Sequence, residues 1–353
     1  MAICICLLLF NLVYFARDFF KRKRSGIPAT PTDIIYPYEA GYSVQKQNLN
    51  SDQVSGIDGM VRWNDRVNDF NYFVGVNLTL ARQKTINNYG EVFLNGWDQY
   101  RWAQTNRWSN VKNGAVWMWE TIGVFQTQEE IDNYPVNIDG ANNVNLRPGD
   151  LIFKDVNGDG LIDDYDKRPL GYAATDYDWD SGNANKNPLL SMGINLGFEY
   201  KGIDFAADFA GGFMNTFIGD WHVKYGIGTD QMGYVYNVID SWQHEDIFDT
   251  KSPWKRGKFP AVRSNNPSIR DWNDFYAKEI NYLRLRNLVV GYTLPIKWTK
   301  KALIQKLRVY FEGSNLLCWD SLNDFGFDPE ISSVTGFDYP QHKVYTVGVN
   351  VTF

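Results

Sequence analysis

Hydrophobic and polar residues alternate with a period of two along several stretches of this chain. The clearest stretch runs from Phe70 to Leu80, where every second residue is apolar and Phe73 is the one exception on the polar side. Such alternation is typical of a β-strand with one apolar face, because successive side chains point to opposite sides of the sheet. The pattern recurs at 190–200, 203–209, 307–311 and 345–353. It predicts an all-β protein with antiparallel strands.

Two further local features refine this prediction. Only Lys201 and Gly202 separate the stretches 190–200 and 203–209, and a two-residue connection with glycine predicts a β-hairpin. The segment 282–294 switches the face of its apolar residues near Asn287, which predicts a β-bulge at that point.

Two architectures explain an apolar face of this kind: a soluble sandwich with a second sheet on that face, or a transmembrane barrel with lipid on it. Several stretches reach roughly ten to twelve residues, whereas typical strands have about five or six. Aromatic residues also lie at strand ends, as at Tyr200, Tyr292 and Phe353. Short turns contrast with long polar insertions, which we expect to be extracellular loops near 88–122 and 219–280. These features favour the barrel, with a secreted, calcium-dependent, carbohydrate-binding β-sandwich as the alternative.

The N-terminal residues 1–16 are apolar except Asn11, and a basic run at 21–24 follows them. A secretory signal peptide carries its positive charges before the apolar core rather than after it. The stretch is also shorter than the roughly 20 residues of a spanning helix. We therefore expect the end of a β-strand, with a membrane anchor as the alternative. The run 22–24 is expected at a strand end or in a loop.

Composition and charge exclude several classes of function. Aromatic residues make up 16% of the chain, and the 30 glycines also fit β architecture better than helices. The net charge of −6, with both signs interspersed, predicts no surface for nucleic acid. The three cysteines and three histidines are too few and too isolated for a disulfide framework, a histidine-based metal site or a catalytic triad. Adjacent carboxylates such as Glu129 and Glu130 are typical of a solvated surface. We therefore expect no enzyme.

One acidic segment, 155–166, has the spacing of a calcium-binding loop. Gly160 stands where such a loop turns sharply, and Leu161 would contribute its backbone carbonyl. The departure is an aspartate at the last position, where glutamate normally binds through both oxygens. A structural Ca²⁺ is the prediction, and a connection rich in Asx turns without a metal is the alternative. The predicted ligands are Asp155, Asn157, Asp159, Leu161, Asp163 and Asp166.

Five tryptophans gather between 97 and 119. Their rings have the chemistry to stack on a substrate such as a sugar, and packing within a long loop is the alternative. They are Trp97, Trp102, Trp108, Trp117 and Trp119.

Several motifs occur in a defined order along the chain: GVFQTQEEID at 123–132, PGDLIFKDVNGDG at 148–160, YLRLRNLVVGYTLP at 282–295, LRVYFEGSNL at 307–316 and the final VTF at 351–353. Together they resemble SusC/RagA-type TonB-dependent transporters of the outer membrane. The resemblance extends over nearly all of residues 1–353. It implies the C-terminal portion of such a protein, with about nine or ten strands of a 22-stranded transmembrane β-barrel.

The resemblance also implies a function. Family members take up nutrients such as glycans or peptides across the outer membrane of Bacteroidetes-type Gram-negative bacteria, together with a SusD-like lipoprotein and the TonB complex. The plug domain, signal peptide and TonB box of the family are not recognisable in this sequence, so a truncated transporter segment lying in the lipid bilayer is expected. By resemblance to outer-membrane barrels generally, Phe353 is expected to serve as a signal for barrel assembly.

Overall fold

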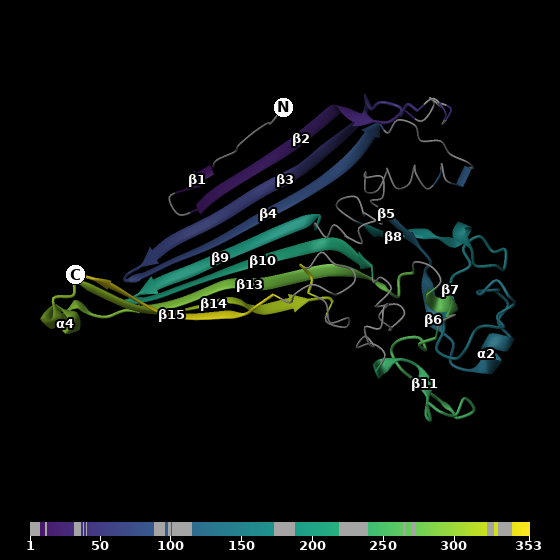
Figure 1. The fold of residues 1–353 in the computed structure, drawn as a ribbon. Helices are drawn as coiled ribbons and strands as arrows, with labels where there is room; N and C mark the ends of the chain where they lie inside the picture. The colour runs from purple at the N-terminus through teal and green to yellow at the C-terminus, as the bar shows by residue number, and fades with distance from the viewer. Residues whose placement is uncertain are drawn as a thin grey trace.

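The computed structural model describes residues 8–10, 13–31, 37, 39, 41–87, 96–97, 100, 115–172, 188–218, 239–263, 266–269, 273–322, 328–330 and 341–353. Within these ranges the dominant feature is a single sheet of nine antiparallel strands, all long except the three-residue β1, that lie side by side in Figure 1. This architecture confirms the predicted fold class and the expected number of strands.

The strands of this sheet pair in the order in which they follow one another along the chain. Such an up-and-down meander is the connectivity of outer-membrane barrels. The strands are β1 (Leu8–Phe10), β2 (Val13–Ala29), β3 (Gln47–Val67), β4 (Phe70–Asn87), β9 (Leu190–Tyr200), β10 (Ile203–Ile218), β13 (Ala277–Thr293), β14 (Lys306–Asp320) and β15 (Val344–Thr352).

The register of the strands places the apolar residues on one face of the sheet. Val76 lies between Val61 on β3 and Ile194 on β9. On the other half of the sheet, Val309 pairs with Tyr292 and Val349. Many side chains of this apolar face are exposed; among them are Trp63, Val74, Leu78, Val290, Val309, Leu317, Trp319, Val347 and Val349. A face this rich in exposed large apolar groups is unusual for a surface in water.

The opposite face of the sheet carries the polar residues that alternate with the apolar ones. It includes Asp58, Asn77 and Asn195 in the middle of the sheet and Asp204 and Arg308 nearer one end. The register between β13 and its two neighbours shifts between Leu285 and Asn287, which confirms the predicted bulge.

Short connections join the strands at one end of the sheet. Asn68 and Asp69 link β3 to β4, and Lys201 and Gly202 link β9 to β10. Both Lys201 (φ 47°) and Gly202 (φ 86°) have positive φ, as a tight hairpin turn requires. The predicted hairpin is therefore confirmed. At the same end, α4 (Ile296–Thr299) and the 3₁₀ turn η6 (Lys300–Ala302) connect β13 to β14.

Two long insertions lie at the other end, between β4 and β9 and between β10 and β13 (Figure 1). Their described residues, within 115–172 and 239–276, form a compact unit that we call the cap. The cap contains the small sheets β5–β8, β6–β7 and β11–β12. Its elements are β5 (Ala115–Met118), β6 (Thr121–Val124), α2 (Gln128–Asp132), β7 (Leu151–Phe153), η2 (Asp164–Asp166), β8 (Arg168–Tyr172), β11 (Gln243–His244), β12 (Trp254–Lys255) and η5 (Pro267–Ile269).

The N-terminal region forms strands as far as the structure describes it. Leu8–Phe10 and Val13–Ala29 belong to β1 and β2, which agrees with the strand interpretation of residues 8–10 and 13–16. The expectation that the basic run 22–24 lies at a strand end or in a loop was wrong. Strand β2 continues through it, and Arg24 pairs with Asp52 on β3. The described residues include no helix long and apolar enough to cross a bilayer.

Candidate functional site

The polar face of the sheet carries many charged and amide side chains, and several of them are paired across strands. Arg308 on β14 forms an ion pair with Asp204 on β10, although β13 lies between their strands. Asn195 donates a hydrogen bond from Nδ2 to Asp208 Oδ1 (2.6 Å) on the neighbouring strand. Each pairing fixes polar groups on the surface, so a polar occupant would meet a preorganised wall.

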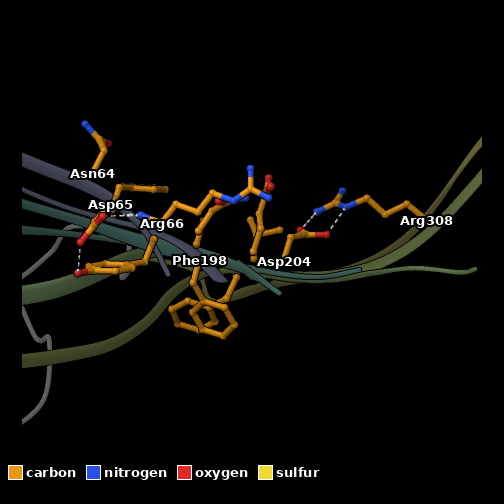
Figure 2. A pocket seen from close by; sticks show the side chains of 13 residues that line it. Asn64, Asp65, Arg66, Phe198, Asp204 and Arg308 are labelled. Atoms are coloured by element: carbon orange, nitrogen blue, oxygen red, sulfur yellow. Dashed lines mark hydrogen bonds and ion pairs between the residues drawn. The ribbon is translucent and has the colours of Figure 1, made fainter. Parts of the chain in front are cut away.

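A hollow of about 700 Å³ lies near the end of the sheet with the short turns. Figure 2 shows Arg66, Asp204 and Arg308 on one side of the strands that line it and Phe198 on the other. Cavities of this size accept a small ligand or a short segment of another element. The lining residues on the polar face are Asn64, Arg66, Asn71, Phe73, Glu199, Asp204, Ala206, Val289 and Arg308.

Three large rings on the polar face lie close over glycines of a neighbouring strand. A Cβ atom at Gly197 would come within 2.7 Å of Phe73 Cε1, and one at Gly56 within 2.5 Å of Phe20 Cζ. The ring of Tyr310 lies equally close over Gly348. Phe73 is the apolar residue that breaks the alternation of its strand, and the glycine opposite explains its place. The guanidinium of Arg62 lies 5.0 Å from the centre of the Phe73 ring.

At the opposite end of the polar face, an ion network attaches residues 328–330 to β13. The Arg284 guanidinium lies 2.6 Å from Asp328 Oδ2 and 2.8 Å from Glu330 Oε2, and Arg286 Nη2 lies 2.5 Å from Glu330 Oε1. Arg284 and Glu330 are nearly buried. Removing one partner of a buried pair leaves an uncompensated charge, so this network holds residues 328–330 firmly on the polar face.

The acidic segment forms a turn-rich loop whose carboxylates accept backbone N–H groups. Asp155 accepts from Gly158 N (2.6 Å) and Gly160 N (2.9 Å). Asp166 is buried and accepts from Val156 N (2.8 Å) and Asp163 N (2.9 Å). The predicted ligands Asn157, Asp159 and Asp163 are likewise engaged in turns, and Leu161 donates its N–H to Asp159.

These carboxylates do not converge on a common point. In the part of the chain that the structure describes, no three histidine, cysteine or acidic side chains are grouped as a metal site requires. The observed geometry matches the Asx-turn alternative, and binding of Ca²⁺ stays a prediction.

The predicted tryptophans differ in exposure, and two of them are in contact: the rings of Trp97 and Trp117 pack edge to face with their centres 5.8 Å apart. Trp119 is 2% exposed, packs on Phe153 with ring centres 5.1 Å apart, and donates from Nε1 to the carbonyl of Asp163 (2.7 Å). Trp117 is also buried, which favours packing as the role of both. Trp97 is only half-buried and stacks on Tyr100 at 5.3 Å. Trp102 and Trp108 lie outside the described residues.

Several known proteins are similar in sequence to this chain. No protein-family model matches it. TonB-dependent receptor P3 of Formosa agariphila is 25% identical over 352 residues, which is 91% of this chain and 31% of the relative. Receptor P26 of the same organism is 24% identical over 341 residues. The chain is a homologue of TonB-dependent receptors. The resemblance inferred from the motifs is thereby confirmed, and the chain spans about a third of the length of these relatives.

Solved structures agree on the fold. The RagAB peptide importer in its "closed-closed" state has a TM-score of 0.60 and 20% sequence identity, and the match covers 97% of this chain and 34% of that one. The "open-open" state of the same importer gives a TM-score of 0.60 at 19% identity. These relatives and neighbours are named as receptors and transporters.

Sequence reasoning missed two parts of this site. The Arg284–Glu330 network joins residues 46 positions apart in sequence, and only the two arginines at 284 and 286, on either side of Leu285, hinted at it. The cavity depends on strand register, which alternation alone does not fix for strands distant in the chain.

Proposed function

We propose that this chain forms part of the wall of an outer-membrane transport barrel for nutrient uptake. The observation that carries the proposal is the division of one nine-stranded sheet into an exposed apolar face and a polar, ion-paired face. In a bilayer the apolar face contacts lipid and the polar face lines an aqueous lumen. A soluble sandwich would instead bury the apolar face under a second sheet.

The two ends of the sheet support an orientation. Short turns are typical of the periplasmic side of such barrels and long insertions of the extracellular side. The cap would then stand outside the cell. TonB as the source of energy is supported by the names of the relatives, and a peptide as cargo by RagAB, which is named a peptide importer. A glycan as the other cargo and a SusD-like lipoprotein as partner are proposed from the resemblance of the motifs.

Cysteine accessibility tests the assignment of the two faces. Leu78 and Asn77 are adjacent on β4, are both exposed, and lie on the apolar and the polar face respectively. Leu78→Cys and Asn77→Cys would be made in a background whose native cysteines are replaced by serine. In lipid vesicles we expect a membrane-impermeant maleimide to label the cysteine at 77 and spare the one at 78. Equal labelling of the two cysteines in lipid vesicles would contradict the barrel.

The part of the tryptophan cluster that reaches the surface supports a place for cargo. Trp97 lies 5.3 Å from both Tyr100 and Tyr165 between ring centres, and about half of each tyrosine is exposed. Stacked aromatic rings with hydroxyls at their edge can contact a sugar ring or an aromatic side chain of a peptide. We expect Trp97→Ala to weaken binding of the cargo in titrations with oligosaccharides or oligopeptides, while Trp298→Ala, at the other end of the sheet, leaves it unchanged.

A further inference from the structure

The cap has one hydrophobic core, to which both insertions contribute. The first insertion supplies most of the buried side chains, among them Phe125, Ile138 and Phe153, and the second supplies Phe259 and Tyr276. Ile280 at the start of β13 and Leu322 just after β14 belong to the same cluster. A buried core of this kind is the usual basis of a cooperative folding unit.

Polar contacts join the two insertions as well. Ser268 Oγ accepts a hydrogen bond from Leu151 N (2.8 Å), and both groups are buried. Arg263 Nη2 lies 2.5 Å from the fully buried carboxylate of Asp150 and donates to the carbonyl of Asn145 (2.9 Å). Each of these bonds would lose its partner if one insertion moved without the other, and an unpaired buried polar group is costly.

The two insertions also approach closely where the backbone at Gly149 meets the side chain of Trp242. Gly149 has φ +93°, and a Cβ atom there would lie 2.6 Å from Trp242 Cβ. Trp242 is itself buried. Only glycine permits this conformation together with this approach. The first insertion is therefore shaped to receive a side chain of the second.

We propose that the two insertions form one cooperative unit, which opens locally only as a whole and is fixed to the sheet at β13. Asp274 accepts a hydrogen bond from Thr121 N (2.8 Å) and is followed within three residues by the first residue of β13. The connection between cap and sheet is therefore direct at this strand. Neither insertion can swing away alone without exposing the shared core. This coupling is a property of the cap and does not depend on the transport function proposed above.

Hydrogen exchange in the whole chain, folded in detergent micelles, tests the coupling. Phe259→Ala perturbs the core from the second insertion. We expect amide exchange to rise at least tenfold in the first insertion, at 121–125 and 146–153, as well as around 259. Phe248 lies in the same insertion and is 92% exposed. Phe248→Ala therefore makes a matched control, which should leave exchange in the first insertion unchanged.

The reciprocal experiment starts from the first insertion. Ile138 is buried and Ile122 is exposed. Ile138→Ala should raise exchange at 258–263 and 273–276, whereas Ile122→Ala should not. Faster exchange confined to the mutated insertion in both experiments would overturn the proposal.

A gentler substitution covers the case in which a core variant does not fold. Ser268→Ala removes the acceptor for Leu151 N and a side-chain hydrogen bond to the Asp150 carboxylate, and it leaves the apolar core intact. We expect its effect to appear in both insertions with one common opening rate under conditions where opening limits exchange. Two separate rates would refute the single cooperative unit.

Discussion

Leu196 offers the sharpest test of which side of the sheet contacts lipid. It lies on the apolar face of β9, paired with Val74 on one side and Ala207 on the other. Its neighbour Asn195 points to the polar face beside Asp208. Leu196→Arg would place a charge among lipid chains, whereas Asn195→Arg would place the same charge in the lumen near a carboxylate.

The position of Leu196 sets the size of the effect. It lies four positions before Tyr200, the aromatic residue at the end of its strand. At about 3.4 Å per residue and a tilt of about 40°, that separation corresponds to a depth of about 10 Å. The apolar band of such barrels is about 25 Å tall, so Leu196 lies close to its midplane. An arginine there costs about 2–4 kcal/mol, and we expect less than about 1 kcal/mol for Asn195→Arg.

The measurement is the free energy of unfolding in guanidinium chloride, from protein folded into lipid vesicles. Wild type and both variants would be compared under one lipid composition. Lipid thickness provides a control, because a thinner bilayer should reduce the cost of Leu196→Arg and leave that of Asn195→Arg unchanged. Equal costs for the two variants, or a larger cost for Asn195→Arg, would refute the assignment of the faces.

Three further predictions concern separate parts of the chain. The carboxylate of Asp139 in the cap accepts three backbone N–H groups; burial alone would raise its pKa, but these donors together outweigh burial and lower it. Asp139→Ala should cost about 1 kcal/mol of stability at neutral pH. The difference between the melting temperatures of wild type and variant should shrink as the pH falls below about 4, and it should vanish once the pH is below the lowered pKa of Asp139. In the acidic loop, Asp155→Ala combined with Asp159→Ala should abolish any calcium-dependent rise in melting temperature, and a wild type indifferent to millimolar calcium would leave the Asx-turn interpretation standing. Deleting Phe353 should lower the surface-exposed fraction in protease-shaving assays and raise the periplasmic fraction, and normal surface levels would contradict its role in assembly.

Alternation predicted the strands of the sheet because a side-chain period of two is a local property of the backbone. It was sufficient for β9 and β15, and for β10 it covered only 203–209 of Ile203–Ile218. It was weaker for β2, where basic residues at 22–24 interrupt the pattern on both faces. The strand continues there because its backbone pairs with β3 and Arg24 finds Asp52 across the strand boundary. That partner is 28 residues away, and no local pattern reveals it.

The fold of the cap could not be predicted from the sequence. Its core residues, such as Phe125, Ile138 and Leu146, follow no helical or strand period, because irregular segments and short elements bring them together. The expected loop near 88–122 is accordingly only the beginning of an insertion that ends where β9 starts. The burial of Trp119 likewise depends on Phe153 and Asp163, which sequence spacing does not place beside it.

The rings that lie close over Gly56, Gly197 and Gly348 would affect the bore of the channel that the polar face is proposed to line. A ring that packs over a glycine can lie nearer the sheet than one that packs over a larger residue, because glycine has no side chain. The three glycines would therefore act as recesses that keep bulky residues out of the path of a solute. A methyl group at any one of them would push the ring above it into that path. The width of such a channel would thus depend on residues that carry no side chain at all.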